Sequence, residues 1–482
     1  MHYIRITKIT DSKEHPKDSY LTLAICVSVG IFFWFLPVPD GLPIDGWHAF
    51  AVFISVILSF ILRPFPMGTM VIFGLMTLML TNTLTVDEAL KGYGNSVVWL
   101  VVAAFLIAGS VVKTGFGLRI ALILVKRFGN SMLGLGYSMT AAELILGPIV
   151  PSNTARGGGI LAPITRSLSE ALGSFPDDKP ERAGAYLTTL GAHANLITAA
   201  MFLTGMAANP VLAESAKIVF NVEFTWGMWA LGAVVPGLVG LVLLPPFIKY
   251  LTKPELDDTK AAQKSALLDL EKLGRRTFSE KVMGVVFVIL IVLWTTKAFH
   301  GMGTTLVAWI GVTLLLLTKT QRWDEMAQNS KAWDTFIWLG GLLTMANTLK
   351  TYGMVDWFAG IMQNMLSDME GLTIVILMAL IYFYSMYAFS MLTAHIFALA
   401  TAFFAVALGV GAPTLLIIAL LAYFSNLCAC ITNYSTGPVI IYFGLGYVKS
   451  PRWFSIGFFV SLFHISIWLT VGLAWWKFLG WW

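Results

Sequence analysis

A group of small polar residues interrupts a long apolar region in the first third of the sequence. The segment GPIVPSNTARGGG (147–159) contains Ser152, Asn153 and Thr154, followed by Arg156. Proline and glycine break a helix and free backbone N–H groups, and a helix that restarts after the break points its positive end at the break. Convergent donors of this kind suit a carboxylate. The alternative is that Ser-Asn-Thr only caps a helix, which leaves Arg156 unexplained.

A second interrupted segment, SMLTAH (390–395), aligns with the first. Thr393-Ala394-His395 matches Thr154-Ala155-Arg156 at an offset of 395 − 156 = 239 residues. The alignment therefore places Arg156 and His395 at equivalent positions of an internal repeat. A charge at the bilayer centre costs about 3 kcal/mol on insertion scales, so both residues are candidates for a functional role. The alternative for His395 is a packing role in an apolar environment.

Two more polar segments lie inside long apolar regions. The first, GAHANLIT (191–198), ends in Thr198, and the second, SNLCACITNYSTGP (425–438), contains Asn433, Ser435, Thr436 and Gly437. Their ANL and SNL triplets match at an offset of 426 − 195 = 231 residues. Discontinuous helices that present their ends to a ligand have this pattern.

Membrane-spanning helices are the elements that must position these breaks. The sequence is 57% hydrophobic and 12% charged, with a mean hydropathy of +0.78, whereas a soluble domain carries roughly 25% charged residues. Apolar stretches of about 20 residues recur along the chain, and a backbone in lipid must be helical to satisfy its own hydrogen bonds. The prediction is an all-α polytopic membrane protein with about 11 transmembrane helices. Two re-entrant helical hairpins are expected in addition, at 131–172 and 372–408.

The chain divides into two halves that repeat with opposite orientation. Trp99 and Trp338 open similar apolar runs, at an offset of 338 − 99 = 239 residues. Basic residues follow the first run and acidic residues follow the second: Arg119, Lys126 and Arg127 against Asp356, Asp368 and Glu370. Positive residues favour the cytoplasmic side, so the two runs face opposite ways, as in the inverted repeats of secondary transporters.

The predicted organisation has four parts in chain order: an N-terminal tail with a first transmembrane helix (1–45), a first half (46–248), a charged cytoplasmic linker (249–281) and a second half (282–482). We expect a multi-pass protein of the inner or plasma membrane, with a cytoplasmic N-terminus and an extracellular C-terminus.

Several other classes of function find little support. The basic residues behind the net charge of +5 lie in short loops, so no nucleic-acid partner is expected. Cys26, Cys428 and Cys430 lie in apolar spans without metal-ligand spacing, and no metal or cofactor is expected. Glu143, His193, Arg156 and His395 are scattered in the sequence, which argues against an enzyme, although folding could gather some of them. A passive anion channel is a further alternative.

With these features the sequence resembles the divalent anion/sodium symporter family. PSNTAR (151–156) and NYSTGP (433–438) most resemble its exchanger branch, which includes bacterial citrate/succinate antiporters and plastid 2-oxoglutarate/malate translocators. The resemblance implies a homodimer that works by an elevator motion and carries a small organic anion such as 2-oxoglutarate, malate, succinate, fumarate or citrate. It also implies the substrate-binding residues Ser152, Asn153, Thr154, Thr198, Thr393, Asn433, Ser435, Thr436 and Gly437.

One departure from the family pattern predicts the mode of transport. Sodium-coupled members carry Ser-Asn-Thr in both hairpins, whereas the second tip here is Met391-Leu392-Thr393. The hypothesis is that Arg156 and His395 replace the sodium ions as fixed positive charges. An empty carrier would then cross the membrane with these positive charges uncompensated, which is slow, whereas the loaded carrier crosses quickly. The chain is therefore expected to be an obligatory, sodium-independent exchanger. The alternative is a sodium-coupled dicarboxylate symporter.

Overall fold

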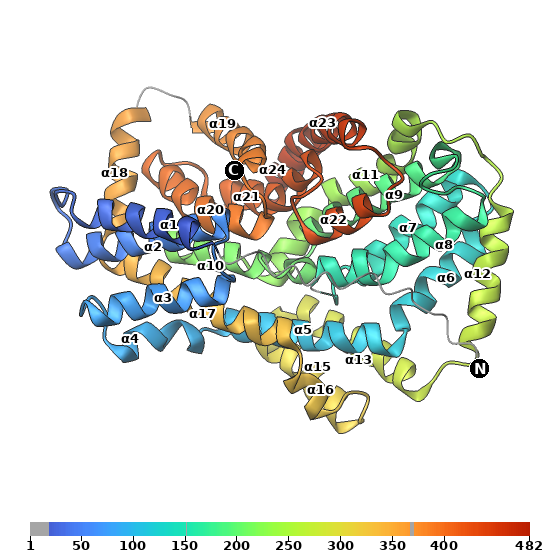
Figure 1. Cartoon of the computed structure of the whole chain (residues 1–482), viewed down its shortest axis with the longest axis horizontal. Coiled ribbons are helices and arrows are strands. Elements are labelled where there is room, and N and C mark those ends of the chain that lie inside the picture. Colours follow the sequence, from blue (N-terminus) through green and yellow to red (C-terminus); the bar gives the residue numbers. More distant parts are fainter. Residues whose placement is uncertain (1–18, 151, 367–370) are drawn as a thin grey trace. The chain divides into compact units, whose positions relative to one another are not determined.

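The computed structural model describes residues 19–150, 152–366 and 371–482 (Figure 1). Within these residues every regular element is a helix, and the only β-type pairing is an isolated bridge between Ser131 and Asp258. Pro151 of the first polar segment, Asp368 and Glu370 of the orientation argument, and residues 1–18 of the N-terminal tail lie outside the described residues.

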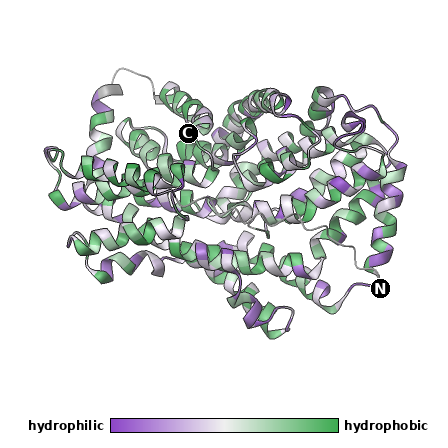
Figure 2. Cartoon of the chain, viewed as in Figure 1, coloured by the Kyte–Doolittle hydropathy of each residue, from purple (hydrophilic) through white to green (hydrophobic). Residues whose placement is uncertain are grey.

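Seven of the described helical segments are long and apolar enough to cross a membrane: Ile44–Leu62, Ser96–Thr114, Trp226–Thr252, Phe278–Thr295, Leu392–Gly409, Thr414–Ile431 and Ser450–Phe478. Shorter apolar helices occur as well. Apolar residues cover most helices, whereas hydrophilic residues gather in loops and on α12 (Lys260–Leu273) (Figure 2). The chain is therefore an all-helical, multi-pass membrane protein, as its composition predicts.

The described residues form two compact units, and the first consists of the described part of Met1–Tyr93 together with Ile337–Met354. Its helices are α1 (Tyr20–Trp34), α2 (Ile44–Leu62), α3 (Met67–Leu80), α4 (Val86–Leu90) and the C-terminal part of α17 (Ser330–Thr351). α1 packs on α2, where the indole N–H of Trp47 donates to the Phe33 carbonyl at 2.8 Å. Thr85 and Glu88 form a capping box that starts α4.

The second unit consists of residues Gly94–Phe336 and Val355–Trp482 and contains all the predicted site residues. Its helices before the linker are α5 (Ser96–Thr114), α6 (Phe116–Phe128), α7 (Met132–Leu146), α8 (Ala162–Ala171), α9 (Gly184–Met201), α10 (Asn209–Phe220) and α11 (Trp226–Thr252). Those after α12 are α13 (Phe278–Thr295), α14 (Lys297–His300), α15 (Thr304–Leu317), α16 (Trp323–Ala327), the start of α17, α18 (Met354–Leu366), α19 (Gly371–Tyr384), α20 (Leu392–Gly409), α21 (Thr414–Leu427), α22 (Gly437–Gly444), α23 (Ser450–Ile467) and α24 (Leu473–Phe478).

Helix α9 forms the core of the second unit. All of its residues are buried, and it packs against α7, α8, α11, α21 and α22. The helix is rich in glycine, alanine and threonine, and such small side chains let neighbouring helix backbones approach closely in a membrane. Burial of a polar group costs free energy unless it is hydrogen-bonded, and on this helix the hydroxyl groups of Tyr186, Thr188 and Thr189 have no hydrogen-bond partner among the described residues.

The helices are interrupted where the polar segments lie. α7 is followed by an irregular stretch and by a π-helical segment, Thr154–Leu161, before α8. α19 runs into a 3₁₀ turn, Ser385–Ala388, and α20 restarts at Leu392. α9 and α21 end close to or in 3₁₀ turns, Leu203–Gly205 and Cys428–Ile431. The sequence predicts that glycines 157–159 belong to the break in the helix. In the structure they are instead helical, since they lie within the π-helical segment Thr154–Leu161. Such π-helical turns occur within otherwise α-helical segments.

Candidate substrate-binding site

The first tip, Ser152-Asn153-Thr154, folds back on its own backbone. The Ser152 hydroxyl accepts a hydrogen bond from the Ala155 N–H at 3.1 Å, and the Asn153 side-chain oxygen accepts one from the Thr154 N–H at 2.9 Å. Ser152 and Asn153 are buried, and Thr154 is half-buried. These contacts are the ones expected of capping residues. They leave the hydroxyl protons of Ser152 and Thr154 without an acceptor among the described residues.

Arg156 lies behind this tip in a cage of oxygen atoms. The side chain is fully buried, and its Nε–H donates to Glu143 Oε2 at 2.6 Å. The other four guanidinium N–H groups reach the Val150 and Gly205 carbonyls at 2.9 and 3.1 Å, the Thr198 hydroxyl at 3.1 Å and the Asn195 carbonyl at 3.4 Å. A guanidinium has five N–H donors, so each one has its own oxygen acceptor.

Glu143 is the residue that the sequence analysis did not place in the site. Its carboxylate, 1% exposed, pairs with Arg156 and also accepts from the Asn195 amide at 3.0 and 3.1 Å. The expectation that Arg156 is an uncompensated cation therefore needs correction, because Glu143 neutralises its charge. The available signal was a lone carboxylate in an apolar helix, 13 residues before an equally isolated arginine.

His395, which the sequence alignment predicts to be the equivalent of Arg156, is also fully buried. Its Nε2 lies 3.0 Å from the Tyr382 carbonyl and 2.8 Å from the Ser385 hydroxyl. A carbonyl can only accept, so Nε2 carries a proton that it donates. Nδ1 has no hydrogen-bond partner in the described part of the chain.

The helix breaks at the two tips also match in the residue that precedes each tip. Tyr382 stands at 382 − 143 = 239 residues from Glu143, which is the offset that relates Arg156 to His395. The Tyr382 hydroxyl pairs at 2.7 Å with Ser425, next to the residue that matches Asn195. At each break, therefore, a residue on the preceding helix contacts both the tip residue and the long broken helix. The first break makes these contacts through the Glu143–Arg156 ion pair, and the second through hydroxyl, carbonyl and imidazole groups.

The segment 435–437 joins the two tips. The Asn153 amide donates to the Thr436 hydroxyl at 3.3 Å, and the Leu392 N–H donates to the Ser435 carbonyl at 2.7 Å. A Cβ atom on Gly437 would lie 2.2 Å from the Thr154 hydroxyl oxygen, so only glycine fits without displacing Thr154. Both tips thus rest on consecutive residues of the same segment.

The structure brings most, but not all, of the predicted residues to this place. Ser152, Asn153, Thr154, Ser435, Thr436 and Gly437 lie at the junction of the first tip and the 435–437 segment, and half-buried Thr393 follows Leu392 at the second tip. Thr198 is buried in the Glu143–Arg156 network. Asn433 instead contacts the Ser450 hydroxyl at 3.5 Å, at the start of α23.

Comparison with known proteins places the chain among membrane transporters. A Bacillus subtilis (strain 168) protein named as a candidate malate transporter, YflS, is 44% identical over 473 residues, which are 98% of this chain and 99% of that protein. Dicarboxylate transporter 1, chloroplastic, of Spinacia oleracea is 38% identical over 95% of this chain and 81% of its own length. The L-tartrate/succinate antiporter of Escherichia coli (strain K12) is 34% identical over 91% of this chain and 94% of its own length.

Solved structures share the fold at low sequence identity. Neisseria gonorrhoeae MtrF superposes with a TM-score of 0.55 at 15% identity, covering 93% of this chain and 96% of that chain. The Alcanivorax borkumensis YdaH transporter gives 0.54 at 12% identity, with 85% and 90% covered. The family described as sodium:sulfate symporter transmembrane region matches residues 17–482. The chain therefore belongs to the sodium:sulfate symporter family, the divalent anion/sodium symporters that its polar motifs resemble.

Proposed function

We propose that the protein is a secondary transporter that exchanges di- and tricarboxylates across the membrane without sodium. The candidate substrates are 2-oxoglutarate, malate, succinate, fumarate and citrate. Relatives of 34–44% identity are named as transporters of malate, of dicarboxylates and of L-tartrate and succinate, the last as an antiporter. These names support the class of substrate and favour exchange over symport.

The observation that carries the sodium-independent part is the oxygen cage around Arg156. Carbonyl, hydroxyl and carboxylate oxygens at the ends of broken helices are the ligands with which transporters hold sodium. Here a guanidinium fills that cage, with five oxygen contacts between 2.6 and 3.4 Å. Because the cation is part of the chain, the transport cycle does not need one from solution.

The ion pair with Glu143 changes the reason for obligatory exchange. An empty site does not carry the charge of Arg156, because Glu143 compensates it. The groups that lose a partner when the substrate leaves are the hydroxyl donors of Ser152 and Thr154. A donor without an acceptor costs about 1–3 kcal/mol when it is buried, as Ser152 is, and each 1.4 kcal/mol slows a step about tenfold. With His395 protonated to compensate part of the substrate's charge, the loaded carrier avoids this cost, and the empty carrier is expected to cross at least about tenfold more slowly than the loaded one.

The proposed substrate site is the junction of the two tips. One carboxylate would take the free donors of Ser152 and Thr154, and Thr393 would face a second carboxylate. His395 is the proposed charge-compensating residue of the second tip. Protonation at its unpartnered Nδ1 would make it cationic without breaking the bond from Nε2 to Tyr382.

The architecture proposed for transport follows the family resemblance. It comprises about 11 spans, two re-entrant hairpins at 131–172 and 372–408, two inverted halves (46–248 and 282–482) around the 249–281 linker, and a homodimer that moves as an elevator. The N-terminus would be cytoplasmic and the C-terminus extracellular. The interrupted helices on each side of both tips support the hairpins.

Counterflow in proteoliposomes tests the proposal. The full chain is reconstituted, and uptake of labelled malate is measured into vesicles preloaded with malate and into empty vesicles, each in sodium and in choline buffer. We expect at least about tenfold faster uptake into preloaded vesicles and the same rate in both buffers. Strong dependence on sodium, or equal uptake into empty and preloaded vesicles, would contradict exchange and favour sodium-coupled symport.

A further inference from the structure

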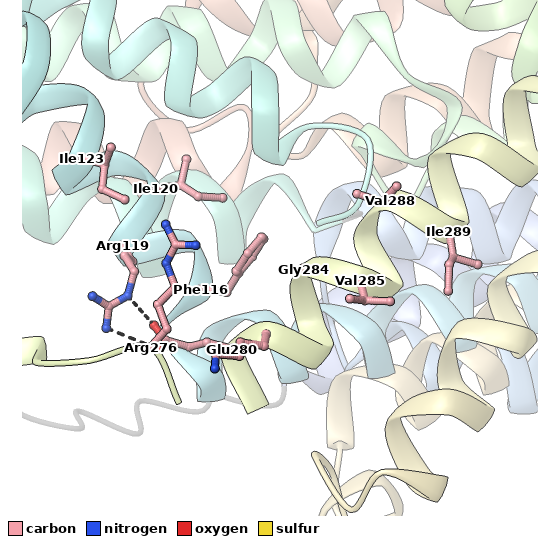
Figure 3. A pocket seen from close by; sticks show the side chains of 11 residues that line it. Phe116, Arg119, Ile120, Ile123, Arg276, Glu280, Gly284, Val285, Val288 and Ile289 are labelled. Atoms are coloured by element: carbon pink, nitrogen blue, oxygen red, sulfur yellow. Dashed lines mark hydrogen bonds and ion pairs between the residues drawn. The ribbon is translucent and has the colours of Figure 1, made fainter. Parts of the chain in front are cut away.

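A groove runs between α6 and α13, away from the tips. Its volume is about 510 Å³, and it is lined by Phe116, Arg119, Ile120 and Ile123 of α6, by Arg276 of the loop before α13, and by Glu280, Lys281, Gly284, Val285, Val288 and Ile289 of α13. Figure 3 shows Arg119, Arg276 and Glu280 close together in this α6–α13 groove and Val285, Val288 and Ile289 further along α13. The lining is therefore divided into a charged end and an apolar length.

The charged end carries an excess of positive charge. Arg119 pairs with Glu280 at 2.7 and 3.2 Å, and it also donates to the Gly274 carbonyl at 3.0 Å, so its donors are occupied. Arg276 and Lys281 are exposed and form no ion pair with any described residue. Three cations against one carboxylate leave a net charge of 3 − 1 = +2 at the lining. The two free cations flank the first turn of α13 and are available to an anion.

The apolar length consists of residues of α13 that face outward from the protein (Figure 3). Val285 and Val288 are 59% and 58% exposed. From Lys281 to Ile289 the helix rises about 12 Å at 1.5 Å per residue, and one leaflet of the hydrocarbon core is roughly 15 Å thick. The spacing from cations to aliphatic side chains therefore matches that from a headgroup to the middle of an acyl chain.

We propose that the α6–α13 groove binds one anionic phospholipid. Its phosphate lies between Arg276 and Lys281, and an acyl chain lies along Val285, Val288 and Ile289. A free phosphate would use only the charged end and leave the aliphatic wall bare. A zwitterionic lipid would leave the net charge of +2 without compensation. The ion pair between half-buried Arg119 and buried Glu280 fixes α6 to α13 and so keeps the groove in shape.

Native mass spectrometry of the purified full chain tests the proposal. The delipidated protein is titrated with phosphatidylglycerol and, separately, with phosphatidylcholine. A basic residue near the headgroups contributes about 1 kcal/mol to binding anionic lipid. We therefore expect the double variant Arg276→Gln/Lys281→Gln to bind phosphatidylglycerol about thirty-fold more weakly, at 1.4 kcal/mol per decade. The wild type should bind phosphatidylcholine no better than this variant binds phosphatidylglycerol.

A matched control separates the site from general charge. Lys126 of α6 and Lys264 of α12 are exposed cations that do not line the groove, so Lys126→Gln/Lys264→Gln should change the affinity by less than about threefold. Val285→Trp keeps all charges but fills the apolar length, and it should also weaken binding. Equal losses in the two double variants, unchanged binding in Val285→Trp, or displacement of the lipid by millimolar inorganic phosphate would each overturn the proposal.

Discussion

Replacing Glu143 by glutamine tests the network behind the first tip most directly. The substitution keeps the shape of the side chain but leaves the Arg156 guanidinium, which is fully buried, without its carboxylate. Removal of one partner from a buried ion pair costs about 3–5 kcal/mol. Unfolding entropy near 2.1 cal/mol/K per residue gives a chain of 482 residues about 1 kcal/mol per degree. The midpoint of thermal unfolding should therefore fall by about 3–5 °C.

The assay is thermal unfolding of the detergent-solubilised full chain, followed by the fraction that remains monodisperse. Glu170→Gln is the matched control, because Glu170 pairs with Arg166 on the neighbouring α8 but is 39% exposed. An exposed pair contributes about 0–1 kcal/mol, so this variant should shift the midpoint by no more than about 1 °C.

A double variant distinguishes a charge effect from a packing effect. Glu143→Gln/Arg156→Gln removes both charges together, and it should be no less stable than Glu143→Gln alone, because no uncompensated charge remains. Equal shifts for Glu143→Gln and Glu170→Gln, or fully additive losses in the double variant, would refute the assignment of a buried, coupled ion pair.

Three further substitutions probe the tips. Gly437→Ala should abolish counterflow, because its Cβ would lie 2.2 Å from the Thr154 hydroxyl oxygen. Gly444→Ala is the control: its Cβ would have no atom within 4 Å, so this variant should transport at the wild-type rate. Arg156→Ser leaves the oxygen cage without its cation, so exchange should be lost in choline buffer and partly restored by sodium. Equal rates in both buffers would contradict the proposal that Arg156 takes the place of a sodium ion. Tyr382→Phe removes the 2.7 Å contact with Ser425 and should lower the unfolding midpoint by about 1 °C, and an unchanged midpoint would show that the contact adds nothing.

Much of the fold follows from composition and pattern. Long apolar stretches in a chain with few charges require helices, and polar, proline- and glycine-rich segments mark where those helices stop, as at Leu146 and Tyr384. The resemblance to a family of anion transporters is equally accessible, because it depends on short motifs such as PSNTAR. The number of spans and the orientation of the chain ends stay predictions, since helix lengths alone do not place them in a membrane.

The partners of the polar residues are harder to predict. Arg156 is recognisable as a buried cation, but its neutralisation by Glu143 depends on how α7 and the π-helical turn fold back on each other. The family resemblance predicts that Thr198 contacts the substrate. In the structure its hydroxyl instead accepts a hydrogen bond from Arg156, and it lies on α9, all of whose residues are buried. Sequence spacing gives the residues that can share a site, whereas the assignment of each donor to an acceptor requires the three-dimensional structure.

The attachment of both tips to consecutive residues has a mechanical consequence. Asn153 is tied to Thr436, and Leu392 is tied to the neighbouring Ser435, and adjacent Cα atoms are held about 3.8 Å apart by a planar peptide. A displacement of either tip that keeps its hydrogen bond therefore also moves this stretch of backbone and the opposite tip. If the substrate binds at the junction of the two tips, as proposed, we expect both of its ends to be released together.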